Sequence, residues 1–267
     1  MNRTNTVLIP YLGGTLTIGR GPIVVAAGPC SIESADHMAI SGARARSSGA
    51  TLYRGGIFKM RTSPTSFQGL GYPALDFIAS AKQKMGLPFI SEITDPRQIE
   101  AMLSVVDIFQ VGSRNMYNYE LLKELGRGQT PVLLKRAMSA TIDEWIKAAD
   151  YVVQGGNSSV ILCERGIRTF ETATRNTLDL NAVAYVKAHT NFPIFADPSH
   201  GTGRADLVAP MARAAVAAGA DGLLIEAHDH PSCALSDADQ AIGFDELAEL
   251  VKSLEPVARA IGRELQT

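Results

Sequence analysis

The sequence contains few cysteines. Cys30, Cys163 and Cys233 are the three among 267 residues. They are odd in number and widely spaced, and no basic and apolar leader with a small-residue cleavage site precedes the first of them. A disulfide framework is therefore not expected, and reduced thiols indicate a cytoplasmic protein.

The chain also lacks an excess of charge of one sign and a long apolar run. Charged residues make up 19% of the sequence, and the formal net charge is -2, which excludes the basic balance of a nucleic-acid-coating protein. The most apolar stretch, from Met211 to Ala220, contains Arg213 and is shorter than the roughly 18 residues that cross a bilayer. We expect neither a nucleic-acid partner nor a membrane partner.

Eight short apolar or β-branched segments alternate with helical patterns along the chain. Strands are predicted at Ile23–Ala27, Thr51–Arg54, Leu87–Ser91, Asp107–Val111, Pro131–Leu134, Ser159–Leu162, Pro193–Ala196 and Gly222–Glu226. Helices are predicted at Ala35–Ser47, Pro73–Met85, Pro96–Val105, Tyr119–Leu125, Thr141–Gln154, Leu180–His189, Arg204–Ala218 and Phe244–Ile261. Strict alternation implies parallel strands, and eight units in about 250 residues are typical of a closed (β/α)₈ TIM barrel.

An open, doubly wound sheet is the alternative fold. A dinucleotide-binding sheet of that kind should carry a G-x-G-x-x-G loop after its first strand, whereas the first strand here runs into Gly28-Pro29-Cys30. The barrel is therefore preferred.

A short β-hairpin is predicted ahead of the first strand, where Val7–Ile9 and Leu16–Ile18 flank two glycines. We expect one catalytic barrel domain over residues 1–267, without a separate regulatory domain. In it, residues 1–20 form an N-terminal hairpin extension that can close the bottom of the barrel.

Basic residues gather after the predicted strands, where the active site of such a barrel lies. They are Arg54, Lys59, Arg61, Arg114, Lys135 and Arg165. A lone residue of this kind is more often a surface charge or part of a salt bridge at the barrel rim. So many cations at matching strand ends would repel one another unless anions bind between them. Because Arg and Lys suit phosphate and carboxylate, we expect a phosphorylated small-molecule substrate.

Four potential metal ligands follow strands one, seven and eight, which are neighbours in a closed barrel. They are Cys30, His200, Glu226 and Asp237. Taken alone, Cys30 is more often a small buried hydrophobe, His200 a hydrogen-bonding loop residue, and Asp237 a helix N-cap. Together, a thiolate, an imidazole and two carboxylates favour one divalent ion of Mn, Fe, Co or Zn over Ca or Mg.

Other histidines and cysteines are weaker candidates. His228 and His230 are alternative ligands, since Glu226 and His228 fall on the same side of an extended segment, or they are groups that support the ligands or contact the substrate. Cys163 is predicted to pack in the core, and Cys233 to be a loop thiol.

Seven long motifs resemble, in order and spacing, those of 3-deoxy-D-arabino-heptulosonate 7-phosphate (DAHP) synthases of the type I-beta group. They are AGPCSIES, YRGGIFKMRTSPTSFQGLG, QVGSRN, PVLLKR, ILCERGIRTFETATRNTLD, DPSHGTGR and IEAHDHPSCALSD. The resemblance covers essentially the whole chain. It implies a (β/α)₈ barrel and a metal-dependent, aldol-type condensation of phosphoenolpyruvate with erythrose 4-phosphate. This reaction gives DAHP and phosphate at the first step of the shikimate pathway to aromatic amino acids.

The same resemblance implies a role for each matching residue. The residues that match metal ligands are Cys30, His200, Glu226 and Asp237. Those that match the groups holding phosphoenolpyruvate are Arg54, Lys59, Arg114, Lys135 and Arg165. Arg61 and Thr62 match the aldose site, and Lys59 and His200 are the candidates for proton transfer. A bound metal would polarise the aldehyde while C3 of phosphoenolpyruvate attacks it, after which water adds at C2 and phosphate leaves.

The sequence departs from the family pattern at two places. Met60 stands where the family usually has proline, and Ser113 where it often has alanine. Because proline stiffens a loop, Met60 leaves the aldose-binding segment more freedom, so the identity of the aldose is the main question.

Two alternatives follow. One is 3-deoxy-D-manno-octulosonate 8-phosphate (KDO8P) synthase, which uses arabinose 5-phosphate and whose aldose loop typically reads Lys-Ala-Asn-Arg-Ser, or a related enzyme with another phosphorylated aldehyde. The other is a catalytically silent metal- or phosphate-binding protein on the same scaffold. Because barrels of this size often assemble, we expect the protein to be a homo-oligomer, either a dimer or a tetramer.

Overall fold

The structure, a computed structural model, describes residues 4–266. The outermost parts of the expected domain, residues 1–3 and 267, lie outside the described residues. Parallel strands close into a barrel in the order β10-β3-β4-β5-β6-β7-β8-β9. Their bounds are β3 Val24–Gly28, β4 Leu52–Arg54, β5 Phe89–Ile93, β6 Ile108–Val111, β7 Val132–Lys135, β8 Val160–Glu164, β9 Ile194–Ala196 and β10 Gly222–Glu226. The predicted TIM barrel is confirmed. Most strand ends differ from the predicted ones by one or two residues.

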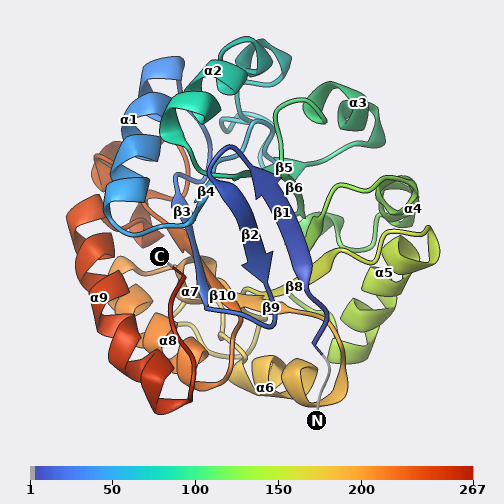
Figure 1. Cartoon of the computed structure of the whole chain (residues 1–267), viewed down its shortest axis with the longest axis vertical. Helices are drawn as coiled ribbons and strands as arrows, with labels where there is room; N and C mark the ends of the chain where they lie inside the picture. The colour runs from blue at the N-terminus through green and yellow to red at the C-terminus, as the bar shows by residue number, and fades with distance from the viewer. Residues whose placement is uncertain (1–3, 267) are drawn as a thin grey trace.

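Helices surround the barrel (Figure 1). The helices that correspond to the predicted ones have these bounds in the structure: α1 Ala35–Ser47, α2 Leu75–Met85, α3 Ile99–Met102, α4 Tyr119–Arg127, α5 Ile142–Gln154, α6 Leu180–His189, α8 Ala205–Ala217 and α9 Phe244–Ala260. Capping explains several starts: the Ser34 hydroxyl accepts the His37 N–H before α1, and Thr141 forms a capping box with Glu144 before α5. The helix expected from Pro96 begins instead as a 3₁₀ turn, and α3 is short.

A five-residue helix, α7 (Pro198–Thr202), was not predicted. It follows β9 directly, and its N-cap is Asp197, whose side chain accepts the backbone N–H of His200. The sequence Pro-Ser-His-Gly-Thr is too short to show a helical period, and glycine lowers its helix propensity. This helix fixes the position of His200 at the carboxyl end of the barrel.

The N-terminal hairpin closes one end of the barrel, as predicted. Strands β1 (Val7–Tyr11) and β2 (Gly14–Ile18) pair antiparallel, and Figure 1 shows them lying across the barrel opening. The alternating residues Val7, Ile9, Leu16 and Ile18 are buried and share one apolar cluster with interior side chains of the barrel, including Cys163. The hairpin therefore extends the barrel core and leaves the opposite end for the site. Cys163 packs in the core, as expected.

None of the helices in residues 4–266 is both long enough and apolar enough to cross a membrane.

Candidate active site

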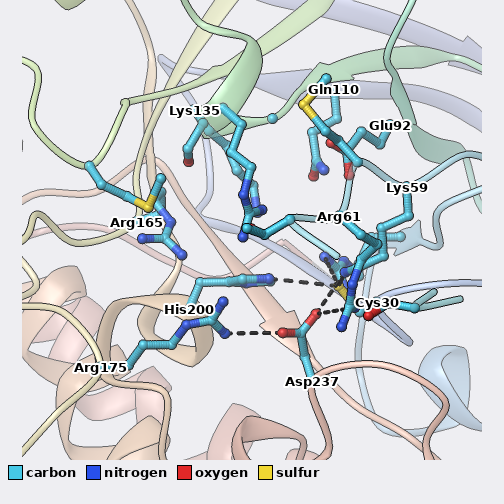
Figure 2. Close-up of a pocket in the computed structure, with 18 of the residues that line it drawn as sticks. Cys30, Lys59, Arg61, Glu92, Gln110, Lys135, Arg165, Arg175, His200 and Asp237 are labelled. Carbon is cyan, nitrogen blue, oxygen red and sulfur yellow. Dashed lines mark hydrogen bonds and ion pairs between the residues drawn. The ribbon is translucent and has the colours of Figure 1, made fainter. Parts of the chain in front are cut away.

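A cavity of about 310 Å³ opens where the barrel strands reach their carboxyl ends. The predicted site residues that line it are Cys30, Arg54, Lys59, Arg61, Thr62, Arg114, Lys135, Arg165, His200 and Asp237. Glu226 does not line the cavity; it is buried at the end of β10. Figure 2 shows cationic side chains from several strand ends pointing toward the same space as Cys30 and Asp237.

The four predicted metal ligands come together. One potential ligand atom from each of Cys30, His200, Glu226 and Asp237 lies within 4.8 Å of the others. The His200 Nε2 is 3.7 Å from both Cys30 Sγ and Glu226 Oε2. Barrel closure brings these residues together. Strand β10 pairs with β3, which places Glu226 opposite Gly28, two residues before Cys30. Strand β10 also pairs with β9, and β9 leads into α7, which carries His200.

The chemistry of this group fits a divalent cation. Burial raises the pKa of the Cys30 thiol, and the Glu226 charge raises it further. Burial also raises the pKa of Glu226 to about 7, with Asp237 contributing in the same direction. The Glu226 Oε1 is buried without a hydrogen-bond partner. Crowded anionic donors with one unsatisfied oxygen are costly on their own, and a bound cation would offset that cost.

His200 is held as a neutral imidazole. Its Nδ1 lies 2.9 Å from Asp197 Oδ2, and its backbone N–H donates to Asp197 Oδ1. Burial lowers the pKa of His200 to about 3, even though Asp197 opposes the shift. The Lys135 ammonium also contacts Asp197, at 2.6 Å. A carboxylate at Nδ1 is the arrangement that orients a metal-binding histidine and leaves Nε2 for the metal.

Asp237 has an unusual backbone conformation. Its φ of 56° and ψ of 36° are left-handed, and it is the one non-glycine residue with positive φ in the described part of the chain. This conformation costs an L-residue about 1–2 kcal/mol. Ion pairs hold the side chain, with Lys59 at 2.7 Å and Arg175 at 3.0 Å. Burial alone would raise the pKa of Asp237, but the Lys59 charge holds it below its ordinary value.

Several cations of the cavity are deeply buried. Arg54, Lys135 and Arg165 are each 4% exposed. Arg114, by contrast, lies at the exposed rim. The Arg54 Nη1 has no hydrogen-bond partner and is 3.9 Å from Glu226. A buried charge costs several kcal/mol when it is poorly paired, and guanidinium groups such as that of Arg54 can offset this cost by pairing with a bound anion.

The four potential metal ligands, Cys30, His200, Glu226 and Asp237, are called the ligand group below. The sequence analysis missed Arg175 and Gln240, which contact this group. Arg175 donates to both Asp237 and Gln240, at 3.0 and 3.1 Å, and Gln240 donates to Glu226 Oε2 at 2.8 Å. Arg175 lies in the loop between β8 and α6, and Gln240 ends a 3₁₀ turn at Ala238–Gln240. Neither position stands at a strand end, so only their place inside or next to the long motifs pointed to them.

Glu92, near the end of β5, is a partly buried acid among the cations. Burial raises its pKa, and Lys59 and Lys135 oppose that shift. It lines the cavity with Gln110 from β6 (Figure 2). Glu92 and Gln110 therefore add polar groups to the wall of the cavity.

Comparison with known proteins places the chain in a family. The sequence profile of the DAHP synthetase I family matches residues 5–262. Phospho-2-dehydro-3-deoxyheptonate aldolase from Thermotoga maritima is 43% identical over 93% of this chain and 74% of its own length. The crystal structure of a T. maritima protein of that name, also described as a DAHP synthase, has a TM-score of 0.92 at 42% identity and covers 98% of this chain and 76% of that one. A 2-dehydro-3-deoxyphosphooctonate aldolase from Bordetella petrii is 29% identical over 91% of this chain and 93% of its own length. The chain belongs to the DAHP synthetase I family.

Proposed function

We propose that the cavity catalyses the DAHP synthase reaction, the condensation of phosphoenolpyruvate with erythrose 4-phosphate to give DAHP and phosphate. The observation that carries this proposal is that a cluster of four potential metal ligands, three of which line the cavity, lies beside buried cations that line the same cavity. The proposal is tested by measuring phosphate release from phosphoenolpyruvate, first with erythrose 4-phosphate and then with arabinose 5-phosphate. Release only with arabinose 5-phosphate would contradict the proposal, as would no release with either aldose.

The cations of the cavity, four buried and one at the exposed rim, would bind phosphoenolpyruvate. Its phosphate and carboxylate require two anion sites, and these residues supply them from four strand ends: Arg54, Lys59, Arg114, Lys135 and Arg165. The planar guanidinium groups suit bidentate contacts with either anion. Their fixed positions would also stabilise the negative charge carried by the departing phosphate.

The ligand group would hold one divalent ion through Cys30, His200, Glu226 and Asp237. When bound, that ion supplies Lewis acidity toward the aldehyde oxygen of the aldose. The mixed sulfur, nitrogen and oxygen donors support Mn, Fe, Co or Zn. Metal analysis of the protein as purified, followed by reconstitution of the apoprotein with each ion, would identify the one used.

Lys59 is the better candidate for proton transfer. Burial alone would lower the pKa of Lys59, but Cys30 and Asp237 raise it above its ordinary value, so its ammonium group is charged. A cation that engages Cys30 and Asp237 would remove these two partners and make the ammonium group a better proton donor. It contacts both Cys30 Sγ and Asp237 Oδ2. His200, whose pKa is about 3, is neutral at physiological pH and suits the role of ligand.

Arg61 and Thr62 would bind the phosphorylated end of the aldose. They line the cavity beside Met60, Ser63 and Ser66. The Arg61 Nη1 is buried without a hydrogen-bond partner and is 3.6 Å from Asp237. A phosphate beside this guanidinium would satisfy it, and it would place the aldehyde end of the sugar toward the ligand group.

The broader setting stays a prediction. We propose that residues 1–267 work as one catalytic domain in the cytoplasm, assembled as a homodimer or homotetramer. Light scattering coupled to size-exclusion chromatography tests the assembly, and a monomer at micromolar concentration would contradict it.

A further inference from the structure

A second cluster of potential metal ligands lies close to the first. In residues 4–266, Glu33, His37 and His228 each offer an atom within 4.8 Å of the others. The Nε2 atoms of both histidines are buried and lack a hydrogen-bond partner, and the rings lie 4.6 Å apart. The cluster needs an explanation because unpartnered buried polar atoms are unusual.

Hydrogen bonding argues against a metal at this cluster. The backbone N–H of Glu33 donates to His37 Nδ1 at 3.2 Å, and that of His230 donates to His228 Nδ1 at 3.0 Å. A neutral imidazole that accepts at Nδ1 carries its proton on Nε2. A metal at Nε2 would force a proton onto Nδ1, where it would face another N–H donor. The two rings are therefore donors at Nε2 and do not fit as ligands.

The Glu33 carboxylate instead joins three segments of the proposed metal site. Its Oε1 accepts the backbone N–H of Leu235 at 2.8 Å and lies 3.3 Å from His228 Nε2. Glu33 comes three residues after Cys30, His228 two residues after Glu226, and Leu235 two residues before Asp237. One carboxylate thus lies between the backbone segments of three proposed ligands.

The turn that carries Asp237 needs such an anchor because its backbone is left-handed there. On the downstream side, Gln240 donates to the Glu226 carboxylate, and the Ile242 N–H donates to the Glu226 carbonyl at 3.0 Å. On the upstream side, the bond from Leu235 to Glu33 ties the turn to the segment that follows β3. A strained conformation persists only where surrounding contacts determine it.

We propose that Glu33 is a positioning residue for the metal site. By accepting the Leu235 N–H beside His228, it fixes Asp237 relative to Cys30 and Glu226. This inference rests on the proposed metal site. It assigns to Glu33 no contact with substrate, and it makes the length of the side chain, rather than its charge, the property that matters.

The test measures the affinity of the metal-free protein for Zn²⁺ by competition with a chromogenic chelator. Glu33→Asp keeps the charge but shortens the side chain, so it should lose the Leu235 contact and weaken binding by about 10–100-fold. Glu33→Gln keeps an oxygen at the same reach and should bind nearly as tightly as the wild type. Glu33→Ala should resemble Glu33→Asp. The opposite order, with Asp normal and Gln weakened, would show that Glu33 acts through its charge and would overturn the proposal.

Glu144→Ala is the matched control. Glu144 accepts the Thr141 N–H at 2.8 Å and caps α5, far from the ligand group in sequence and on another element. This variant should lower the melting temperature and leave Zn²⁺ affinity unchanged. If Glu33→Ala does not fold, the Asp and Gln variants still decide the question.

Two failures are distinguishable. A wild-type protein that does not bind Zn²⁺ would remove the proposed metal site itself. A wild-type protein that binds Zn²⁺, with all three Glu33 variants unchanged, would overturn only the role of Glu33. As a second readout, the visible spectrum of the Co²⁺-substituted protein should change in Glu33→Asp, because a displaced Asp237 alters the coordination geometry, and should stay unchanged in Glu144→Ala.

Discussion

The Lys59 ammonium lies 2.7 Å from the Asp237 carboxylate, and both side chains are largely buried. Lys59 belongs to the proposed phosphoenolpyruvate site and Asp237 to the proposed metal site, so this ion pair joins the two. A cation that binds Asp237 competes with Lys59 for the same carboxylate. Metal binding would therefore release the ammonium group toward the substrate.

Replacing Lys59 should separate the two sites. Lys59→Met should lower kcat by about 10²–10⁴-fold through loss of proton transfer, while metal affinity stays the same or becomes tighter because a competing cation is gone. Steady-state kinetics and metal titration measure the two effects. Lys84→Met, on the exposed surface of α2, is the control and should change neither. Loss of metal together with activity in Lys59→Met would contradict the competition.

Removing the proposed thiolate ligand should abolish metal-dependent activity. We expect Cys30→Ala to retain the wild-type circular dichroism spectrum and to lose bound metal. Cys163→Ala is a matched control because Cys163 is buried in the barrel core. The control should lower stability by roughly 1 kcal/mol through a small cavity and keep its metal. Full activity of Cys30→Ala after chelation would rule out the metal site.

Metal binding should tighten as pH rises through neutrality. In the metal-free protein the pKa of Glu226 is raised to about 7, so the carboxyl is protonated below that pH and must lose its proton to bind metal. Burial also raises the pKa of the Cys30 thiol, which adds a second released proton. Affinity should fall about tenfold per pH unit below 7 for each proton displaced. Isothermal titration at several pH values measures this slope, and a slope of zero between pH 6 and 7 would contradict the assignment.

The hairpin should contribute stability and not catalysis. Ile9 is fully buried between the hairpin and the barrel core, so Ile9→Ala should cost about 2–5 kcal/mol of unfolding free energy. Leu8, its exposed neighbour, serves as the control, and Leu8→Ala should have little effect. In both variants kcat/KM of the folded enzyme should match the wild type, since the site is at the other end of the barrel. A specific loss of kcat/KM in Ile9→Ala would show coupling between the two ends.

Met60 bears on the choice of aldose. Met60 lines the cavity between Lys59 and Arg61. If the freedom of this segment limits binding, Met60→Pro should lower the KM for erythrose 4-phosphate and leave the KM for phosphoenolpyruvate unchanged. Equal KM values for the aldose in both proteins would show that loop stiffness does not matter.

Sequence reasoning found the barrel and most of the cavity because both follow from periodic features. Alternation of apolar runs and helical patterns identifies parallel strands, and the parallel direction brings all carboxyl ends to one face. Cys30 and Glu226 could therefore be placed side by side across the junction of β3 and β10, where the barrel closes.

Loop contacts followed no such rule. Arg175 reaches Asp237 from a loop 62 residues away, and Gln240 reaches Glu226 across a turn. Helix α7 is too short to show a period, so the support that Asp197 gives His200 was not predicted. Contacts of this kind depend on how the loops pack, and no local pattern encodes them.

The most direct test of the account is the stoichiometry of the reaction with the metal-loaded enzyme. With erythrose 4-phosphate, each phosphoenolpyruvate consumed should yield one phosphate and one DAHP, measured by phosphate assay and mass spectrometry. Removal of the metal should stop the reaction, and adding back Mn²⁺ or Zn²⁺ should restore it. Consumption of phosphoenolpyruvate that is faster with arabinose 5-phosphate, or that continues without metal, would contradict the account.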